Sequence, residues 1–322
     1  MSFRRLAFAS FAFAATFAGS HPAAQAQTAL TIIPTFDNTI NNDPNAATIK
    51  STINQVIAVY EARFTTKTPT TVNITFQEMN SGLGQSSTFI GTVSYSNYRS
   101  ALASHATTAD DTTAVNSLPT GSSVTINGTN FTTVAISTAT GRALGFSGFD
   151  VPSDGTVSLR TSIMNLSRTG TQDSSKYDLF AVAAHEIDEV LGFGSAVGGG
   201  FPAGTLRPQD LFRYDQNGQR SFTSSSTAQA FFSIDGTTQL VQYNQNSSGD
   251  FGDWTQGVPP RVQDAFATAG AQPDLGVELI GLDVIGYDLV PVPEPGLVLG
   301  VAAAGLGAAA GLRRRLGRRP GR

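Results

Sequence analysis

The most regular hydrophobic pattern in the chain lies between residues 176 and 192, where apolar side chains recur every three or four positions. The positions with this spacing are Leu179, Phe180, Val182, Ala183, Ile187, Val190 and Leu191. Such a period is typical of a helix with one buried face. Ser175 and Asp178 form a candidate capping box at its start, and Gly192 or Gly194 can end it. We therefore predict one amphipathic, largely buried helix over about residues 176–192.

Helical and alternating patterns also precede this segment. An apolar stripe from Ile49 to Phe64 predicts a helix that Asp43 caps and Pro44 opens. Alternation at Val72, Ile74 and Phe76 predicts a half-buried strand. Three further elements are predicted before residue 176: a helix carrying Tyr98, Leu102 and His105, a hairpin turning at Asn127-Gly128, and a strand through Val157 and Leu159.

Short strands and a last helix are predicted after it. Strand-like runs cover 210–214, 231–234 and 240–243, with a turn at Asp235-Gly236. Apolar residues over 277–285 predict the last helix. Because strands and helices intermingle without a repeat or a long linker, we expect one α+β domain over residues 27–290.

Charge and composition exclude several classes of function. Residues 27–290 hold 12 Lys and Arg against 23 Asp and Glu, a net charge of −11, whereas both ends are basic. An acidic domain repels phosphate backbones, so we expect no nucleic-acid partner. The absence of Cys excludes disulfides, thiolate metal sites and a Cys nucleophile. The chain has three His, at 21, 105 and 185, and the first lies in the expected leader, so a three-His metal site is excluded.

The N-terminal 26 residues have the pattern of a secretory signal peptide. Arg4-Arg5 form a positive segment, residues 6–18 are apolar, and Ala24-Gln25-Ala26 supplies small residues for cleavage before Gln27. The alternative is a buried N-terminal helix, which Pro22 and the small polar residues beside it disfavour. We therefore expect an exported protein whose mature chain begins at residue 27.

The C-terminal residues 291–322 contain a second targeting pattern. Pro293-Glu294-Pro295 precedes the uncharged segment 296–312, and Arg313-Arg314-Arg315 follows it. This order resembles the PEP-CTERM sorting signal of Gram-negative bacteria that secrete exopolysaccharide. The resemblance implies a transmembrane helix over 296–312, an Arg-rich cytoplasmic tail, sorting at the inner membrane and processing by an exosortase-type enzyme. Transient anchoring would leave the acidic domain extracellular or at the cell surface. A simple tail anchor predicts nearly the same topology.

The predicted helix over 176–192 also carries the candidate chemistry. His185 and Glu189 are four residues apart, so both side chains leave the same helix face and can bind one metal ion. Glu186 lies about 100° around the helix, where it can act as general base on a metal-activated water. A carboxylate in place of a second His favours cations harder than Zn²⁺. The alternative is a structural His185 among acidic neighbours.

Residues 184–193 resemble the active helix of the metzincin-type zinc metalloproteases, whose pattern is His-Glu-x-x-His-x-x-Gly-x-x-His. Gly192 matches the helix-ending glycine, Glu189 stands at the second His, and Ser195 at the third. Four further segments resemble a secreted metzincin-like family that also ends in PEP-CTERM tails: 210–214, 232–236, 253–254 and 282–288. The resemblance implies a twisted mixed sheet with an active-site helix, then a C-terminal subdomain of hairpins and a last helix.

The chain departs from that family at two positions. Asp253 precedes Trp254 where the family has a His, and Gln263 precedes Asp264 where the family has the methionine of the Met-turn. The resemblance therefore implies a ligand set of His185, Glu189 and Asp253 for Zn²⁺ or a harder divalent cation such as Ca²⁺ or Mn²⁺. The site is then either retuned or retired from catalysis.

Two functions remain open from the sequence. The first is a secreted metal-dependent endopeptidase that hydrolyses a peptide or protein substrate, with Glu186 as the catalytic base. The second is a catalytically inactive extracellular matrix or surface protein on the same scaffold, with acidic residues that bind a cation or nothing. Carbohydrate binding ranks last, because only the extracellular location and the aromatic residues favour it.

Overall fold

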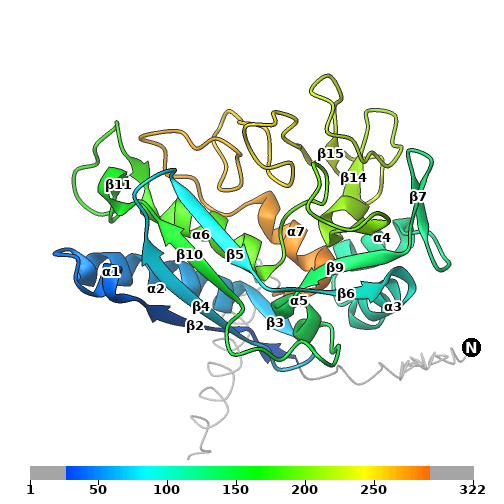
Figure 1. Ribbon diagram of the computed structural model, residues 1–322, viewed down its shortest axis with the longest axis horizontal. Helices are drawn as coiled ribbons and strands as arrows, with labels where there is room; N and C mark the ends of the chain where they lie inside the picture. The colour runs from blue at the N-terminus through cyan, green and yellow to red at the C-terminus, as the bar shows by residue number, and fades with distance from the viewer. Residues whose placement is uncertain (1–26, 291–322) are drawn as a thin grey trace, which may run out of the picture.

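The computed structural model describes residues 27–290, which combine seven α-helices with several small sheets in an α+β arrangement (Figure 1). The helices are α1 (Asn38–Asn41), α2 (Ala46–Arg63), α3 (Tyr95–His105), α4 (Ala109–Ser117), α5 (Thr138–Ala143), α6 (Leu179–Leu191) and α7 (Val277–Gly286), with 3₁₀ turns at Thr161–Ile163 and Pro208–Phe212. The α+β class predicted from the sequence is thus confirmed.

The strands are mostly short and form six sheets within the described residues. They are β1 (Thr28–Ala29), β2 (Thr31–Phe36), β3 (Phe64–Thr66), β4 (Thr71–Glu78), β5 (Gly84–Thr88), β6 (Ile90–Ser94), β7 (Val124–Ile126), β8 (Thr129–Phe131), β9 (Thr133–Ser137), β10 (Gly155–Leu159), β11 (Met164–Asn165), β12 (Tyr177–Asp178), β13 (Thr205–Leu206), β14 (Arg213–Tyr214), β15 (Phe231–Phe232), β16 (Val241–Gln242) and β17 (Asp288–Leu289).

The predicted targeting segments lie outside the described residues. These are the signal peptide over 1–26 and the sorting segment over 291–322, including its expected transmembrane helix at 296–312. Among the helices of residues 27–290, none combines the length and the apolar character that crossing a membrane requires.

The largest sheet is mixed and has the order β2-β4-β10-β5. β2, β4 and β10 run parallel, and β5 pairs antiparallel with β10; β2 and β5 are the two edge strands. The predicted alternation is confirmed on β4, where Val72, Ile74 and Phe76 are buried. Their side chains cover one face of the sheet with apolar surface, against which helices pack.

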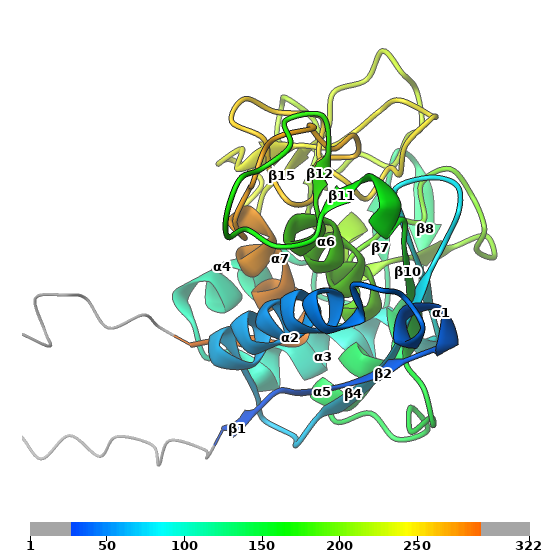
Figure 2. The same cartoon turned by 90° about the vertical axis from the view of Figure 1, so that its left-hand side faces the viewer.

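Helices α2 and α6 pack against each other and against this sheet (Figure 2). α6 contacts β5 and β10, so its position is set relative to the edge strand β5. Tyr60 of α2 fixes the helix pair, because its hydroxyl lies 2.7 Å from Asp188 Oδ1 and 2.9 Å from the Ala184 carbonyl oxygen. The face of α6 that points away from α2 lines a cavity.

The bounds of α6 differ slightly from the prediction. The helix begins at Leu179, and its cap is Asp178, which accepts a hydrogen bond from the Ala181 N–H; Ser175 is not the cap. Residues 177–178 pair with β11 instead, which delays the helix start. The end is as predicted: Gly192 has φ 136°, and a Cβ there would lie 2.5 Å from Thr140 Oγ1.

The predicted bounds of two other elements are wrong for local reasons. α2 begins at Ala46 after Asn45, because Asp43 accepts a hydrogen bond from the Asn45 N–H and forms a turn before the helix. Phe64 lies beyond α2, in β3. The predicted strand at 210–214 is a 3₁₀ turn followed by two residues of β14, because the Asp210 carboxylate accepts a hydrogen bond from the Arg207 N–H.

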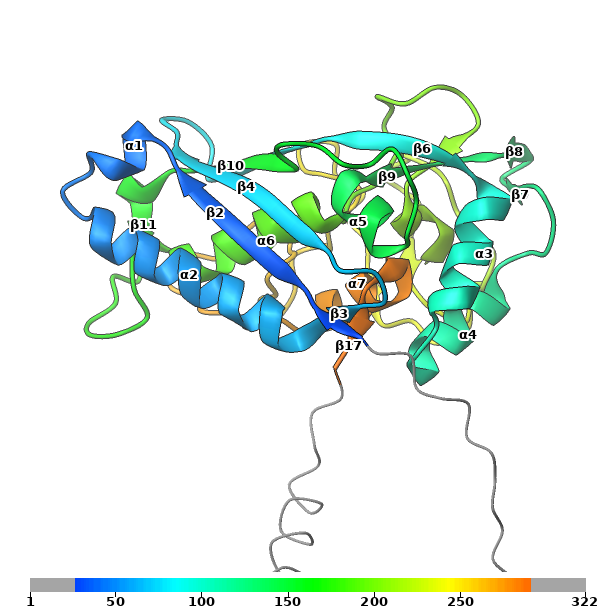
Figure 3. The same ribbon diagram turned by 90° about the horizontal axis from the view of Figure 1, so that it is seen from below.

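Residues 192–276, between α6 and α7, contain little regular structure. Their small sheet has the order β14-β15-β16, and Trp254 is fully buried against Phe193, Phe232 and Tyr243. The predicted turn at Asp235-Gly236, the last helix and the hairpin at Asn127-Gly128 are all present. The first and last described strands, β1 and β17, both pair with β3 at one side of the molecule (Figure 3).

Candidate metal centre

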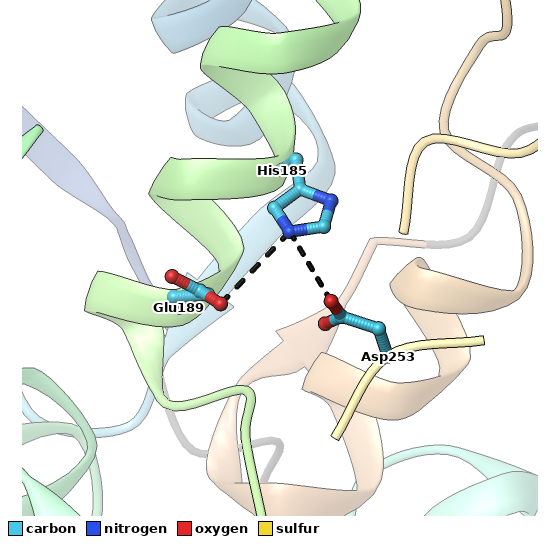
Figure 4. A group of neighbouring side chains, drawn as sticks. All are labelled: His185, Glu189 and Asp253. Carbon is cyan, nitrogen blue, oxygen red and sulfur yellow. Dashed lines mark ion pairs between the residues drawn. The ribbon is translucent and has the colours of Figure 1, made fainter. Parts of the chain in front are cut away.

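Three side chains predicted to bind a metal ion converge beside α6 (Figure 4). His185 Nε2 lies 3.9 Å from Glu189 Oε1 and 3.7 Å from Asp253 Oδ2. One donor atom from each residue lies within 4.8 Å of the other two, and residues 27–290 contain no other such group. The helix spacing that predicted His185 and Glu189 on one face is confirmed, and Asp253 joins them from a segment 64 residues later.

The ring of His185 is oriented by a backbone carbonyl. Its Nδ1 lies 3.0 Å from the Val262 carbonyl oxygen, so Nδ1 carries a hydrogen and donates it. Nε2 therefore faces the two carboxylates (Figure 4). This is the arrangement found at metal-binding histidines, where the second ring nitrogen is held by a carbonyl or a carboxylate.

Three backbone segments lie side by side under the site and position Asp253. Trp254 pairs with Tyr243 on one side and with Asp264 on the other. The Trp254 N–H donates to the Gln263 carbonyl oxygen at 2.8 Å, and the Ala265 N–H donates to the Trp254 carbonyl at 2.9 Å. The burial of Trp254 fixes this ladder, so the side chain of Asp253 is held toward His185.

The edge strand β5 borders the site on the other side. Ser86 Oγ donates to Glu189 Oε2 at 2.5 Å, which leaves Oε1 of the same carboxylate facing His185. Glu186 is buried against the same strand, where a Cβ added to Gly84 would lie 2.3 Å from Glu186 Oε1. A larger residue at position 84 would force this carboxylate and the nearby Val182 side chain to move, so β5 positions Glu186 as well as Glu189.

Burial, together with the neighbouring charges, shifts the pKa values of the acids and of the histidine in this site. Burial, followed by the charge of Glu189, raises the pKa of Glu186 to about 9. Burial raises the pKa of Asp253 to about 7, against the opposing effect of His185. Burial alone lowers the pKa of His185, but the nearby carboxylates, with Asp253 first, outweigh it and raise that pKa to about 10. The carboxylates therefore favour a positive charge at Nε2, either a proton or a bound cation.

The donor set fits a divalent cation. It consists of one imidazole nitrogen and carboxylate oxygens, which suit Zn²⁺, Mn²⁺ and, with more oxygens, Ca²⁺. The side chains of His185, Glu189 and Asp253 are only 16%, 19% and 6% exposed, so few waters compete for the ion. These residues could hold a metal ion, and its identity is not set by these three alone.

The site lies in a cleft that extends in both directions from Glu189. One cavity of about 660 Å³ contains His185, Glu186, Glu189 and Asp253 in its lining. A second cavity of about 430 Å³ shares Glu189 with the first and continues along β5 toward the glycine loop at 198–199. Such a cleft accommodates an extended ligand across the site.

Other residues singled out in the sequence lie outside the donor group. Ser195 donates its hydroxyl hydrogen to Asp210, which keeps it in a loop contact. His105 is the last residue of α3 and packs there, with its pKa lowered by burial and by Lys67. Sequence reasoning missed Ser86 and Gly84, because neither a serine nor a glycine in a polar strand signals a metal site.

Comparisons of the chain with protein-family models, with curated proteins and with solved structures gave no match.

Proposed function

We propose that the protein is a metal-dependent endopeptidase with a metzincin-like domain over residues 27–290. The observation that supports this most strongly is the convergence of His185, Glu189 and Asp253 within 4.8 Å, next to the buried Glu186 and inside a cleft. A mixed sheet with an antiparallel edge strand beside the site helix, followed by short hairpins and a last helix, is consistent with that fold.

The roles of the residues follow from their positions. His185, Glu189 and Asp253 bind the cation, and Val262 and Ser86 hold two of these ligands in place. The cation supplies Lewis acidity, which lowers the pKa of a water and polarises a carbonyl group. Glu186 would be the base that takes a proton from the attacking water and returns it to the leaving nitrogen. The pKa of Glu186, about 9 here, would fall beside a bound cation, so that the carboxylate could act as base near neutral pH.

The edge strand offers a place for the substrate backbone. β5 pairs with β10 on one side only, and its residues line both cavities of the cleft. An extended polypeptide can add to such an edge by backbone hydrogen bonds, which selects peptides without strict sequence preference. This pairing would place a peptide bond beside Glu189 and Glu186.

We further propose that the protein is exported by residues 1–26 and sorted through residues 291–322 at the inner membrane, where an exosortase-type enzyme processes the tail. The domain then acts outside the cell or at its surface. Analysis of the mature ends by mass spectrometry tests this: cleavage before Gln27 and loss of residues after Pro293-Glu294-Pro295 are expected, and an intact chain in the cytoplasm contradicts it.

The enzymatic proposal is tested with an unstructured protein substrate such as casein. Cleavage should require a divalent cation, stop in chelator and fall at least about 100-fold in Glu186→Gln, since general base catalysis contributes about 10²–10⁴ in rate. Metal content should remain unchanged in that variant. If the protein binds a cation but cleaves no substrate under any condition, the inactive matrix or surface protein is the better description.

A further inference from the structure

One buried side chain in the metal centre belongs to none of the roles above. Gln263 is completely buried, and its side chain ends between two proposed ligands. The amide nitrogen Nε2 lies 3.4 Å from His185 Nε2 and donates to Asp253 Oδ1 at 3.0 Å. Both distances are similar to the separations among the three ligands themselves, 3.7 and 3.9 Å.

The other end of the same amide has no partner. Gln263 Oε1 is buried and receives no hydrogen bond within the described residues. A buried carbonyl oxygen without a donor is costly. The opposite orientation of the amide can therefore be the more stable one when the contents of the site change. Rotation by half a turn about the last side-chain bond exchanges Oε1 and Nε2 with little movement of other atoms.

The rotated amide suits a site that holds a cation. Its oxygen would then lie near Asp253 Oδ1 and His185 Nε2, where the three atoms repel one another unless a positive charge lies between them. With no positive charge between these atoms, the amide nitrogen is the favourable end because it donates to Asp253. The charge at the centre therefore selects which end of the amide faces the ligands.

The backbone of Gln263 is too well held to let the side chain leave. Its N–H donates to Glu278 Oε1 at 3.1 Å, and its carbonyl oxygen accepts from the Trp254 N–H at 2.8 Å. Glu278 and Trp254 are themselves buried. The amide therefore stays at the floor of the site in either orientation.

We propose that Gln263 is a fourth protein ligand, which binds the cation through Oε1. This rests on the metal site proposed above. A set of one nitrogen and three oxygens, one of them a neutral amide, favours Mn²⁺ or Ca²⁺ over Zn²⁺ more than the three predicted ligands do.

The direct test is a crystal structure of the wild-type protein soaked with Mn²⁺, located by anomalous scattering. The expected result is Gln263 Oε1 within about 2.4 Å of the ion, a distance typical of oxygen ligands to such cations. An ion bound by His185, Glu189 and Asp253 while Gln263 still directs Nε2 at Asp253 overturns the assignment and leaves the metal site intact. No ion at the site overturns both proposals.

Titration of Mn²⁺ into variants provides a second measurement in solution. Gln263→Met removes both polar atoms and should weaken Mn²⁺ binding about tenfold or more. Gln263→Glu keeps an oxygen but loses the N–H donor, so it should retain at least the wild-type affinity. Equal losses in both variants would show that the N–H matters, which contradicts ligation. Gln77→Met, which alters a partly buried amide bonded to Ser158 on the main sheet, should bind as the wild type does.

Discussion

The contact between Tyr60 and Asp188 controls how α6 is held, and its protonation state can be tested. Tyr60 Oη is close to two acceptors, Asp188 Oδ1 at 2.7 Å and the Ala184 carbonyl oxygen at 2.9 Å, yet it has one hydrogen. Burial, followed by the charge of Glu278, raises the pKa of Asp188 well above its ordinary value. This shift favours the protonated carboxyl group, and we predict that Asp188 donates to Tyr60 Oη while Tyr60 donates its one hydrogen to the Ala184 carbonyl oxygen.

This arrangement predicts how much two substitutions change the free energy of unfolding. Asp188→Asn replaces a neutral carboxyl group with an amide of similar shape that still donates to Tyr60, so the free energy of unfolding should change by less than about 1 kcal/mol. Tyr60→Phe removes the hydroxyl and leaves the Asp188 carboxyl group buried without a partner. That loss should lower the free energy of unfolding by about 1–3 kcal/mol.

Urea unfolding at pH 7 measures both changes. Tyr98→Phe is the matched control, because Tyr98 is also fully buried and donates to a neutral acceptor, the Ile285 carbonyl oxygen at 2.9 Å. Its loss should be about 1 kcal/mol. If Asp188→Asn instead lowers the free energy of unfolding by about 3 kcal/mol or more, the value for breaking a buried charged pair, then Asp188 is ionised and the reasoning is refuted.

Two further predictions concern β5 and α7. Gly84→Ala places a Cβ 2.3 Å from Glu186 Oε1, which displaces the proposed base. The variant should lower peptidase turnover at least about tenfold while its metal content stays the same. Unchanged turnover would contradict the role of β5 in positioning Glu186. Burial raises the pKa of Asp283 from 3.8 to about 7, so its protonated form is favoured in the folded protein. The contribution of Asp283 to the free energy of unfolding is at most about 4 kcal/mol. It is fully present below about pH 4 and is lost as the pH rises through about 7. As the pH rises from 4 to 8, the midpoint of urea unfolding should therefore fall less in Asp283→Asn than in the wild type. The same pH dependence in both proteins would contradict a raised pKa for Asp283.

The elements with strong apolar periods were predictable from the sequence. β4 buries the three residues that its pattern indicated, and α6 and α7 bury most of theirs, with Phe180, Val277 and Ile280 partly buried, because a helix or strand with one apolar face has few other ways to remove it from water. The edge strand β5 was not predicted. Its sequence, Gly-Gln-Ser-Ser-Thr, has no apolar alternation, since this strand owes its position to pairing with β10 and to contact with α6.

The site was predictable only in part, for a similar reason. His185 and Glu189 lie on one helix, and the helical repeat brings them together without further information. Asp253 joins them through the buried Trp254 and its pairing with Tyr243 and Asp264, which involves contacts between distant segments. A resemblance to a family pointed to Asp253, whereas nothing in a single sequence reveals which side of the ladder faces the helix.

The central claim is that His185, Glu189 and Asp253 bind one divalent cation, and its most direct test is metal analysis of the purified protein after dialysis against Mn²⁺ or Zn²⁺. One cation per chain is expected in the wild type and in Asp250→Ala, a control that removes an exposed acid from the same cleft. Glu189→Ala should lose the ion. Less than about 0.1 cation per chain in the wild type, or equal binding by wild type and Glu189→Ala, would contradict the claim.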